Sequence, residues 1–176
     1  MTNQKHYARG RRPDRDRGPR VPEEFKEKLL DLRRVTRVVA GGKRLRFRAT
    51  LVVGDEKGRV GIGIGKGGDV QTAITKARTR GRKAVIRIAL AGRTIPHEVE
   101  AKFSAAHVRL KPAIEGHGLK AGGAARVVLS LLGVKDIVGK CLGRTPNKLT
   151  NALATLEALK QLKSEKRHAI TPTARS

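Results

Sequence analysis

The sequence predicts an α+β protein built from two small domains. Three short runs of alternating apolar residues, over residues 35–39, 44–53 and 60–64, are separated by glycine-rich turns and followed by a basic helical segment. After residue 84, further strand-like runs come before two apolar helical segments. Strands followed by helices are typical of an α+β domain in which helices cover one face of a sheet.

The second of these runs has the clearest period of a strand. One of its faces carries only apolar side chains, namely Leu45, Phe47, Ala49, Leu51 and Val53. The opposite face begins with Arg44, Arg46 and Arg48. Such a strand packs a core with one side and presents parallel cations to a phosphate backbone with the other.

The neighbouring runs fit the same sheet. The first stops at Gly41-Gly42, a pair suited to the positive φ angles of a hairpin turn. The third follows a turn over residues 54–58 and alternates apolar side chains with glycine. Asp69 then suits the N-cap of a helix whose apolar residues recur at helical spacing, at Val70, Ala73, Ile74 and Ala77. Phe25, Leu29 and Leu32, also at helical spacing, predict a short helix over residues 21–32.

Charge is the dominant feature of the composition. Among 176 residues, 40 Lys and Arg stand against 15 Asp and Glu, a net charge of +25. Such self-repulsion favours a polyanionic partner, and nucleic acid is the usual one. An anionic membrane is the rival, but no apolar run reaches the ~20 residues of a spanning helix and the N-terminus lacks the apolar core of a signal peptide. The single cysteine, Cys141, fits a reducing cytoplasm.

The chain divides into four parts by composition. We expect a basic extension over residues 1–22, a first domain over 23–88, a second over 89–163 and a polar tail over 164–176. After residue 84 the patterns predict strands over 85–90, 94–101, 108–111 and 137–142 and a buried helix over 124–132 that ends at Gly133. A last helix opens at Pro146, with Leu149, Leu153, Leu156 and Leu159 on its inner face.

The segment over residues 63–68 has three readings. It matches the dinucleotide fingerprint G-x-G-x-x-G, but no acidic residue follows at the required distance and no parallel sheet surrounds it. Ile64-Gly65-Lys66-Gly67-Gly68 also resembles the loop with which KH domains clamp a nucleic-acid backbone, although that loop joins two helices. Third, the glycines could let phosphates approach the N-terminus of the following helix.

No catalytic or metal-binding constellation is expected. The histidines are scattered, and Glu115 with His117 lacks a third ligand. Cys141 lies among apolar residues, which favours a buried, inert thiol. We therefore predict no catalytic residue, no metal, no cofactor and no small-molecule substrate.

Several motifs occur in one order along the chain: Gly41-Gly42-Lys43-Arg44, Val52-Val53-Gly54-Asp55, Gly58-Arg59-Val60-Gly61, Lys111-Pro112-Ala113 and Ala121-Gly122-Gly123. Together they resemble the ribosomal protein five family of the bacterial small subunit, over residues 25–162. The resemblance implies an N-terminal domain similar to double-stranded-RNA-binding domains, with a three-stranded antiparallel sheet plus a helix. It also implies a C-terminal α/β sandwich of four strands and two helices.

The resemblance further implies partners and a location. The partners are small-subunit ribosomal RNA, ribosomal proteins four and eight, and messenger RNA along the path by which it enters. In this family the Gly-Gly loop lies beside the spectinomycin site, near the decoding region, in the cytoplasmic small subunit. RNA-binding residues are expected at Arg34, Arg37, Gly41, Gly42, Lys43, Arg44, Arg46, Arg48, Arg59, Lys66, Arg78, Arg82, Lys120 and Arg126. A protein-neighbour interface is expected at Phe103, His107 and Arg109.

The sequence departs from the family pattern at residues 67–71, at His117 and at residues 144–148. The prediction is a structural RNA-binding protein of the ribosome that supports translational accuracy, and not an enzyme. Two rivals remain, a free-standing KH-like regulator of RNA and an enzyme that uses the C-terminal fold, which the family shares with some small-molecule kinases.

Overall fold

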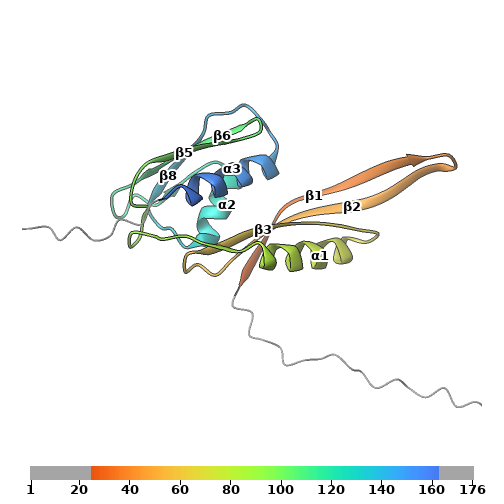
Figure 1. Cartoon of the computed structure of the whole chain (residues 1–176), viewed down its shortest axis with the longest axis horizontal. Helices are drawn as coiled ribbons and strands as arrows, with labels where there is room; N and C mark the ends of the chain where they lie inside the picture. The colour runs from red at the N-terminus through yellow and green to blue at the C-terminus, as the bar shows by residue number, and fades with distance from the viewer. Residues whose placement is uncertain (1–24, 163–176) are drawn as a thin grey trace, which may run out of the picture.

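The computed structural model describes residues 25–162, which fold into two α+β domains packed against each other (Figure 1). The expected basic extension over residues 1–22 and polar tail over 164–176 lie outside the described residues. A four-stranded sheet with one helix precedes a second four-stranded sheet with two helices. This arrangement confirms the predicted α+β class.

The N-terminal sheet is antiparallel, with strand order β1-β2-β3-β4. Its strands are β1 (Lys26–Val39), β2 (Gly42–Gly54), β3 (Arg59–Gly67) and β4 (Ile86–Arg87). Helix α1 (Val70–Lys83) lies along one face of this sheet (Figure 1). Asp69 is its N-cap, as predicted, and the backbone N–H of Asp69 donates to Thr72 Oγ1 at 3.3 Å. The strand predicted over residues 85–90 is limited to the two residues of β4.

The helix predicted over residues 21–32 is wrong in the part that the structure describes. β1 already begins at Lys26 and pairs with β2 along its whole length. A register shift between Leu29 and Asp31 turns Leu30 into the core, where it is 8% exposed. The apolar residues that suggested a helix, Leu29 and Leu32, are 43% and 40% exposed on the strand. Pairing with a long partner strand overrides the local helical pattern.

Glycines of β3 let α1 pack directly on the strand backbone. A Cβ atom added at Gly63 would lie 2.0 Å from the carbonyl oxygen of Ala77, and one at Gly65 would lie 2.1 Å from that of Ala73. Gly61 and Gly67 are equally crowded against α1 and the residues that flank it. The segment over residues 63–67 is therefore strand, which excludes the dinucleotide and KH-loop readings. The glycines at positions 61, 63, 65 and 67 admit the helix, whereas Gly68, beside the helix N-terminus, has nothing within 4 Å of its Cβ position, so the approach of a phosphate there stays a prediction.

The C-terminal sheet has strand order β5-β6-β8-β7, and two helices pack against it (Figure 1). Its elements are β5 (Val99–Phe103), β6 (Ala106–Pro112), β7 (Leu119–Lys120), α2 (Gly123–Leu132), β8 (Ile137–Cys141) and α3 (Lys148–Lys160). The strand predicted over residues 94–101 begins later, because Thr94 instead closes a turn by bonding Ala91.

The two predicted C-terminal helices are confirmed, with different details at each end. α2 ends at Gly133, whose φ is 94°. α3 begins two residues after Pro146, because Asn147 is the N-cap and accepts a hydrogen bond from the N–H of Leu149. On α3, Leu156 and Leu159 are buried as predicted, whereas Leu149 and Leu153 are half-buried. Alanine and threonine side chains complete its buried face.

The domains meet where the β2–β3 turn contacts the C-terminal end of α2. The backbone N–H of Glu56 donates to Leu131 O at 2.9 Å, and that of Gly58 donates to Leu132 O at 3.0 Å. A Cβ atom at Gly133 would lie 2.1 Å from Glu56 O. Val52 and Val60 of the N-terminal sheet belong to the same hydrophobic core as the C-terminal domain. Backbone contact and a shared core therefore fix the two sheets relative to each other.

The direct contact of β3 with α1 can be tested with Gly63→Ala. The new methyl group would overlap helix backbone, and overpacking of this kind costs about 1–3 kcal/mol. We expect a lower melting temperature in thermal unfolding. Gly68→Ala is the control, since nothing lies within 4 Å of its Cβ position. Equal melting temperatures for the two variants would contradict the proposed contact.

Candidate nucleic-acid interface

The β1–β2 hairpin extends well beyond the rest of the N-terminal sheet (Figure 1). β3 pairs with β2 only from Phe47 to Gly54, so the hairpin beyond Phe47 has no third strand. At its tip Gly42 has a φ of 131°, and Val38 is 73% exposed. The sequence predicted positive φ at both tip glycines, and the structure has it only at Gly42. A two-stranded ribbon is marginally stable alone, so this exposed arm suits contact with another molecule.

The strand register gathers arginines on one side of this arm. Residues directly opposite each other in an antiparallel pair point to the same side of the sheet. Arg37 lies opposite Arg44, and Arg33 lies opposite Arg48. On β3, Lys66 continues the second of these rows, because it lies opposite Arg48. We call this surface the basic face, and it consists of Arg33, Arg37, Arg44, Arg46, Arg48 and Lys66.

A groove of about 260 Å³ runs along the basic face, with Arg37, Arg44, Arg46 and Lys66 in its walls. None of these four side chains has an ion-pair partner within residues 25–162. At the root of the arm Arg33 binds Asp31 at 2.6 Å. The Nε atom of Arg48 is buried without a hydrogen-bond partner in the described part of the chain. The groove thus exposes cations whose charges the fold itself does not neutralise.

The RNA-binding residues predicted from the sequence include most of the basic face, but also residues on the opposite side of the sheet. Arg34 lies opposite Phe47 and Lys43 lies opposite Val38, so both point away from the basic face. Leu45 is on the predicted apolar side, but it is 43% exposed because it lies beyond the end of α1. Arg33 was missed. Counting outward from a Gly41-Gly42 turn would have paired it with Thr50, whereas the structure places the turn at Ala40-Gly41, which pairs Val39 with Gly42 and Arg33 with Arg48.

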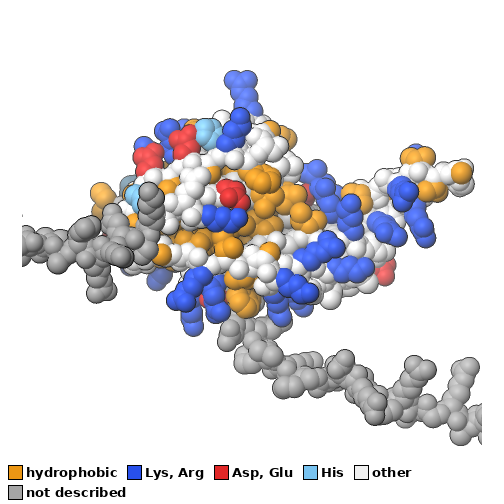
Figure 2. Space-filling model, in the orientation of Figure 1, with side chains coloured by type: hydrophobic (Ala, Val, Ile, Leu, Met, Phe, Trp, Pro, Cys, Tyr) orange, Lys and Arg blue, Asp and Glu red, His pale blue; other side chains and the backbone are white. Residues whose placement is uncertain are grey.

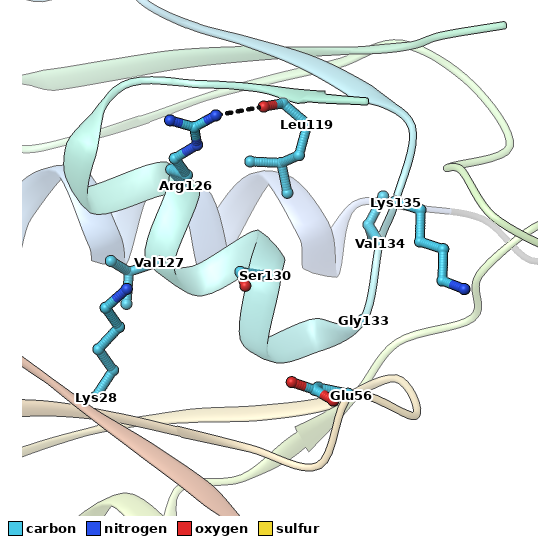
Figure 3. Close-up of a pocket in the computed structure, with 9 residues that line it drawn as sticks. All are labelled: Lys28, Glu56, Leu119, Arg126, Val127, Ser130, Gly133, Val134 and Lys135. Atoms are coloured by element: carbon cyan, nitrogen blue, oxygen red, sulfur yellow. Dashed lines mark hydrogen bonds between the residues drawn. The ribbon is translucent and has the colours of Figure 1, made fainter. Parts of the chain in front are cut away.

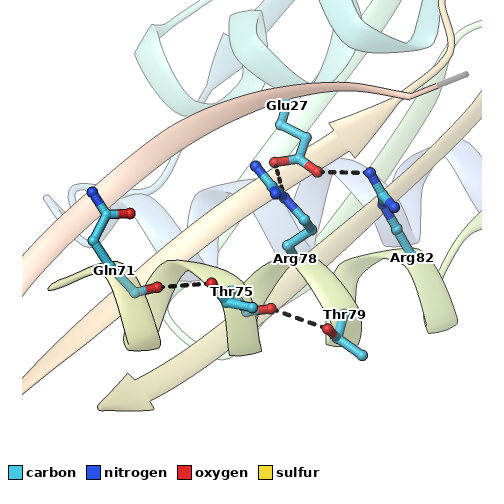
Figure 4. A network of polar contacts seen from close by, with 6 residues as sticks. All are labelled: Glu27, Gln71, Thr75, Arg78, Thr79 and Arg82. Carbon is cyan, nitrogen blue, oxygen red and sulfur yellow. Dashed lines mark hydrogen bonds and ion pairs between the residues drawn. The ribbon is translucent and has the colours of Figure 1, made fainter. Parts of the chain in front are cut away.

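Two of the predicted RNA-binding arginines bind the same carboxylate (Figure 4). Arg78 Nε lies 2.7 Å from Glu27 Oε2, and one terminal nitrogen of Arg82 lies 3.3 Å from Glu27 Oε1. Glu27 is on β1 and both arginines are on α1, so the contact ties the helix to the edge strand. These arginines therefore have a structural partner besides any RNA.

Arg59 is also held within the fold. Its Nε donates to Asp55 Oδ2 at 2.6 Å, and its guanidinium lies 5.1 Å from the centroid of the Phe25 ring. Burial alone would raise the pKa of Asp55, but the hydrogen bonds from the Arg59 side chain and from the N–H groups of Lys57 and Arg59 lower it below its ordinary value. The charge on Asp55 therefore anchors the β2–β3 turn.

The predicted C-terminal cations lie far from the arm along the chain. Lys120 Nζ is 3.2 Å from His117 Nε2. Arg126, on α2, donates to the carbonyl oxygen of Leu119 at 3.0 Å. Lys and Arg side chains are spread along the hairpin and the lower side of the molecule, and over β5 and β6 they stand among acidic and histidine side chains (Figure 2).

Two of the predicted protein-neighbour residues, His107 and Arg109, belong to a surface of mixed charge, whereas Phe103 lies opposite Ala106 and points to the other side of the sheet. The outward side of β5, β6 and β8 carries both signs, and we call it the mixed face: Glu98, Glu100, Lys102, His107, Arg109, Lys111 and Lys140. Arg109 Nε donates to Glu100 Oε2 at 2.6 Å, and this bond lowers the pKa of Glu100. His107 binds the other oxygen of Glu100. Phe103, at the end of β5, is 38% exposed.

Residues 25–162 contain no group of three His, Cys, Asp or Glu side chains that could hold a metal ion. Near Glu115 and His117 the buried acid is Asp136, which accepts hydrogen bonds from the N–H of Gly118 at 2.9 Å and from Arg93 Nε at 3.0 Å. The Gly118 bond and then the Arg93 contact hold the pKa of Asp136 below its ordinary value, against the effect of burial. Cys141 is half-buried rather than buried, and desolvation raises the pKa of its thiol.

Two protein families match the sequence. The family described as "Ribosomal protein S5, N-terminal domain" matches residues 25–89, and that described as "Ribosomal protein S5, C-terminal domain" matches residues 101–171. A relative, the small ribosomal subunit protein uS5c of Emiliania huxleyi, is 46% identical over 151 residues, which cover 85% of this chain and 93% of the relative. The chain belongs to the ribosomal protein S5 family.

Membership in the S5 family confirms the resemblance that the sequence motifs indicated. RNA binding and a part in translation follow from the family, which is structural rather than enzymatic. Across the described residues no helix is long and apolar enough to cross a membrane.

The contact of Glu27 with Arg78 and Arg82 can be tested with Glu27→Gln. The change should cost about 1 kcal/mol of stability or less, because both arginines are partly exposed. It should also strengthen RNA binding by about 0.2–1 kcal/mol, since two guanidinium groups lose their internal carboxylate. Melting temperature and filter binding to small-subunit ribosomal RNA give the two results.

Glu115→Gln is the matched control for that experiment. It removes the same charge from an exposed loop residue that has no ion-pair partner within residues 25–162. If both variants gain equal affinity, net charge alone matters and the two arginines do not reach the RNA.

Proposed function

We propose that the protein is a structural constituent of the small ribosomal subunit and binds small-subunit ribosomal RNA through its basic face. The observation that carries this proposal is the register of the hairpin, which aligns Arg33 with Arg48 and Arg37 with Arg44. The family and the uS5c relative support the location. The basic face then supplies the contact with RNA.

The geometry of a strand suits this task. Side chains on one face recur every two residues, about 6.6 Å apart, and neighbouring strands lie about 4.8 Å apart. Arg44, Arg46 and Arg48 therefore form a row of separate cations, each able to meet its own phosphate. Guanidinium groups bind phosphate oxygens in bidentate fashion. Release of counterions from the RNA then contributes most of the binding free energy.

We further propose that the mixed face contacts neighbouring ribosomal proteins, with proteins four and eight as the expected neighbours. Glu98 and Glu100 would repel a phosphate backbone, whereas alternating charges suit a protein partner. The His107–Glu100 and Arg109–Glu100 contacts give this surface polar groups of both signs, and Phe103 is exposed at the end of the strand that carries Glu100.

The finer placement is also part of the proposal. The projecting arm suits insertion into RNA near the decoding region, beside the spectinomycin site and along the path by which messenger RNA enters. From there it would support translational accuracy, in the cytoplasm. The domain limits stay part of the proposal as well, at residues 23–88 and 89–163, and the separate family matches to residues 25–89 and 101–171 support a division of the chain into two domains.

Co-sedimentation separates this function from that of a free-standing RNA regulator. A subunit constituent travels with the small subunit in stoichiometric amount at high salt, and a regulator dissociates. Substoichiometric, salt-sensitive association would contradict the proposal.

The basic face is tested with the double variant Arg44→Gln/Arg46→Gln. Each lost phosphate contact should lower the salt-dependence slope of binding by roughly 0.9 on duplex RNA or about 0.7 on a single strand. The fold should persist, because both side chains are exposed. Filter binding to small-subunit ribosomal RNA over a range of salt gives the slope. Lys102→Gln/Lys140→Gln, on the mixed face, removes equal charge and should leave the slope unchanged. An unchanged slope in the Arg44/Arg46 variant would mean that the arginines are merely hydrated.

The tip of the arm is tested with Gly42→Val and Lys43→Ala. At a φ of 131°, valine should cost about 1–3 kcal/mol and displace the tip. Lys43→Ala removes a cation without strain. We expect both variants to alter spectinomycin response or miscoding, and only Gly42→Val to lower the melting temperature. Normal drug response and fidelity in both variants would show that the tip is only a connector.

A further inference from the structure

A second cationic surface lies between the two domains, apart from the arm (Figure 3). It is a hollow of about 610 Å³ beside α2. One cation comes from the N-terminal domain, Lys28 on β1, and two come from the C-terminal domain, Arg126 on α2 and Lys135 after it. Neither Lys28 nor Lys135 was among the RNA-binding residues predicted from the sequence. No composition pattern links them, because only the packing of the domains brings them together.

The charges in this hollow are mostly uncompensated. Lys28 and Lys135 have no ion-pair partner within residues 25–162. The acid in the lining, Glu56, is already bonded by Lys26 at 2.7 Å. Arg126 uses one N–H group on Leu119 O, which fixes the guanidinium and leaves its charge unopposed. Three cations of the lining outnumber its one carboxylate, which is already paired with Lys26, so the hollow favours an anionic occupant.

The backbone around the hollow is held in place before any partner binds. The N–H groups of Lys135 and Asp136 donate to Arg93 O at 3.0 and 3.1 Å. On the opposite wall the N–H of Glu56 donates to Leu131 O at 2.9 Å. The Arg93 bonds hold the backbone at Lys135 within the C-terminal domain, and the Glu56 bond joins the two domains, so the backbone that carries the cations is in place before an anion binds.

The hollow and the basic face lie on the same side of the N-terminal sheet. Lys28 lies directly opposite Val52. Val52 is two and four residues beyond Thr50 and Arg48 on β2, so alternation puts its side chain on the basic-face side. α2 covers that side near Val52, and the arm leaves it uncovered beyond Arg48. A single polyanion could therefore contact both cationic surfaces.

We propose that the hollow binds the phosphate backbone of a second segment of small-subunit ribosomal RNA. The proposal rests on the RNA binding assigned to the basic face. Lys28 and Lys135 meet phosphate oxygens, and Arg126 adds a guanidinium whose orientation is fixed. Since the cations come from both domains, RNA bound there also holds the domains together. The apolar lining, Leu119, Val127 and Val134, suits the sugar face of a nucleotide, and the one acid of the lining, Glu56, is paired with Lys26.

The test compares salt-dependence slopes for full-length small-subunit ribosomal RNA. Lys28→Gln/Lys135→Gln should lower the slope by roughly 1.4–1.8, two contacts at about 0.7–0.9 each. Its melting temperature should stay at the wild-type value, because both side chains are exposed. Lys28→Arg/Lys135→Arg should keep the wild-type slope. The mixed-face control, Lys102→Gln/Lys140→Gln, should keep it as well.

The possible outcomes separate this proposal from the function itself. Suppose that Lys28→Gln/Lys135→Gln keeps the wild-type slope and Arg44→Gln/Arg46→Gln lowers it. This result would contradict RNA binding at the hollow and would still support RNA binding at the basic face. Wild-type slopes in both variants would overturn the RNA contact of the basic face too. If the mixed-face control lowers the slope by the same amount, net charge alone explains the effect at both cationic surfaces, and both proposed contacts are wrong. Lys28→Gln/Lys135→Gln could instead lower the melting temperature without changing the slope, while Lys28→Arg/Lys135→Arg keeps the wild-type melting temperature. That result would mean that the lysines stabilise the fold and do not contact RNA, and it would also overturn the proposal.

Discussion

The direct packing of α1 on the backbone of β3 is the constraint on which the rest of the structure depends. Alternate glycines of β3, among them Gly63 and Gly65, leave no side chains between strand and helix, and Ala73 and Ala77 meet them from the helix. This contact closes one side of the N-terminal sheet with little side-chain volume. The other side is then left for two tasks, binding the C-terminal domain and carrying cations.

Those two tasks are divided along the length of β2. Near its C-terminal end, Val52 is fully buried in the core shared with α2. Towards its N-terminal end, Arg44 and Arg46 point to the same side but lie beyond the helices, in the part of the hairpin that extends past the hydrophobic core. The strand alternation is the same throughout, so strand length relative to the core decides which part packs and which part meets a partner.

Net charge alone overstates the number of cations that the protein presents. Arg78 and Arg82 bind Glu27, and Arg59 binds Asp55, so these side chains hold β1, α1 and the β2–β3 turn in place. Arg37, Arg44 and Lys66 lack such partners within the described residues. The same residue type therefore serves the fold in one place and faces the solvent in another, according to the nearest carboxylate.

Sequence by itself determined the features that depend on local pattern: the strand-strand-strand-helix order, a hairpin turn next to Gly42, the buried helix after Gly122 and the family motifs. The turn itself falls one residue earlier than expected, at Ala40-Gly41. Local pattern failed at Leu29 and Leu32, because pairing of β1 with a long partner strand outweighs a helical spacing. Tertiary structure alone decided that the β3 glycines admit a helix, that Arg33 joins the basic face and that Lys28 meets Lys135. These are contacts between residues distant in the chain, and the spacing of neighbours along a sequence carries no record of them.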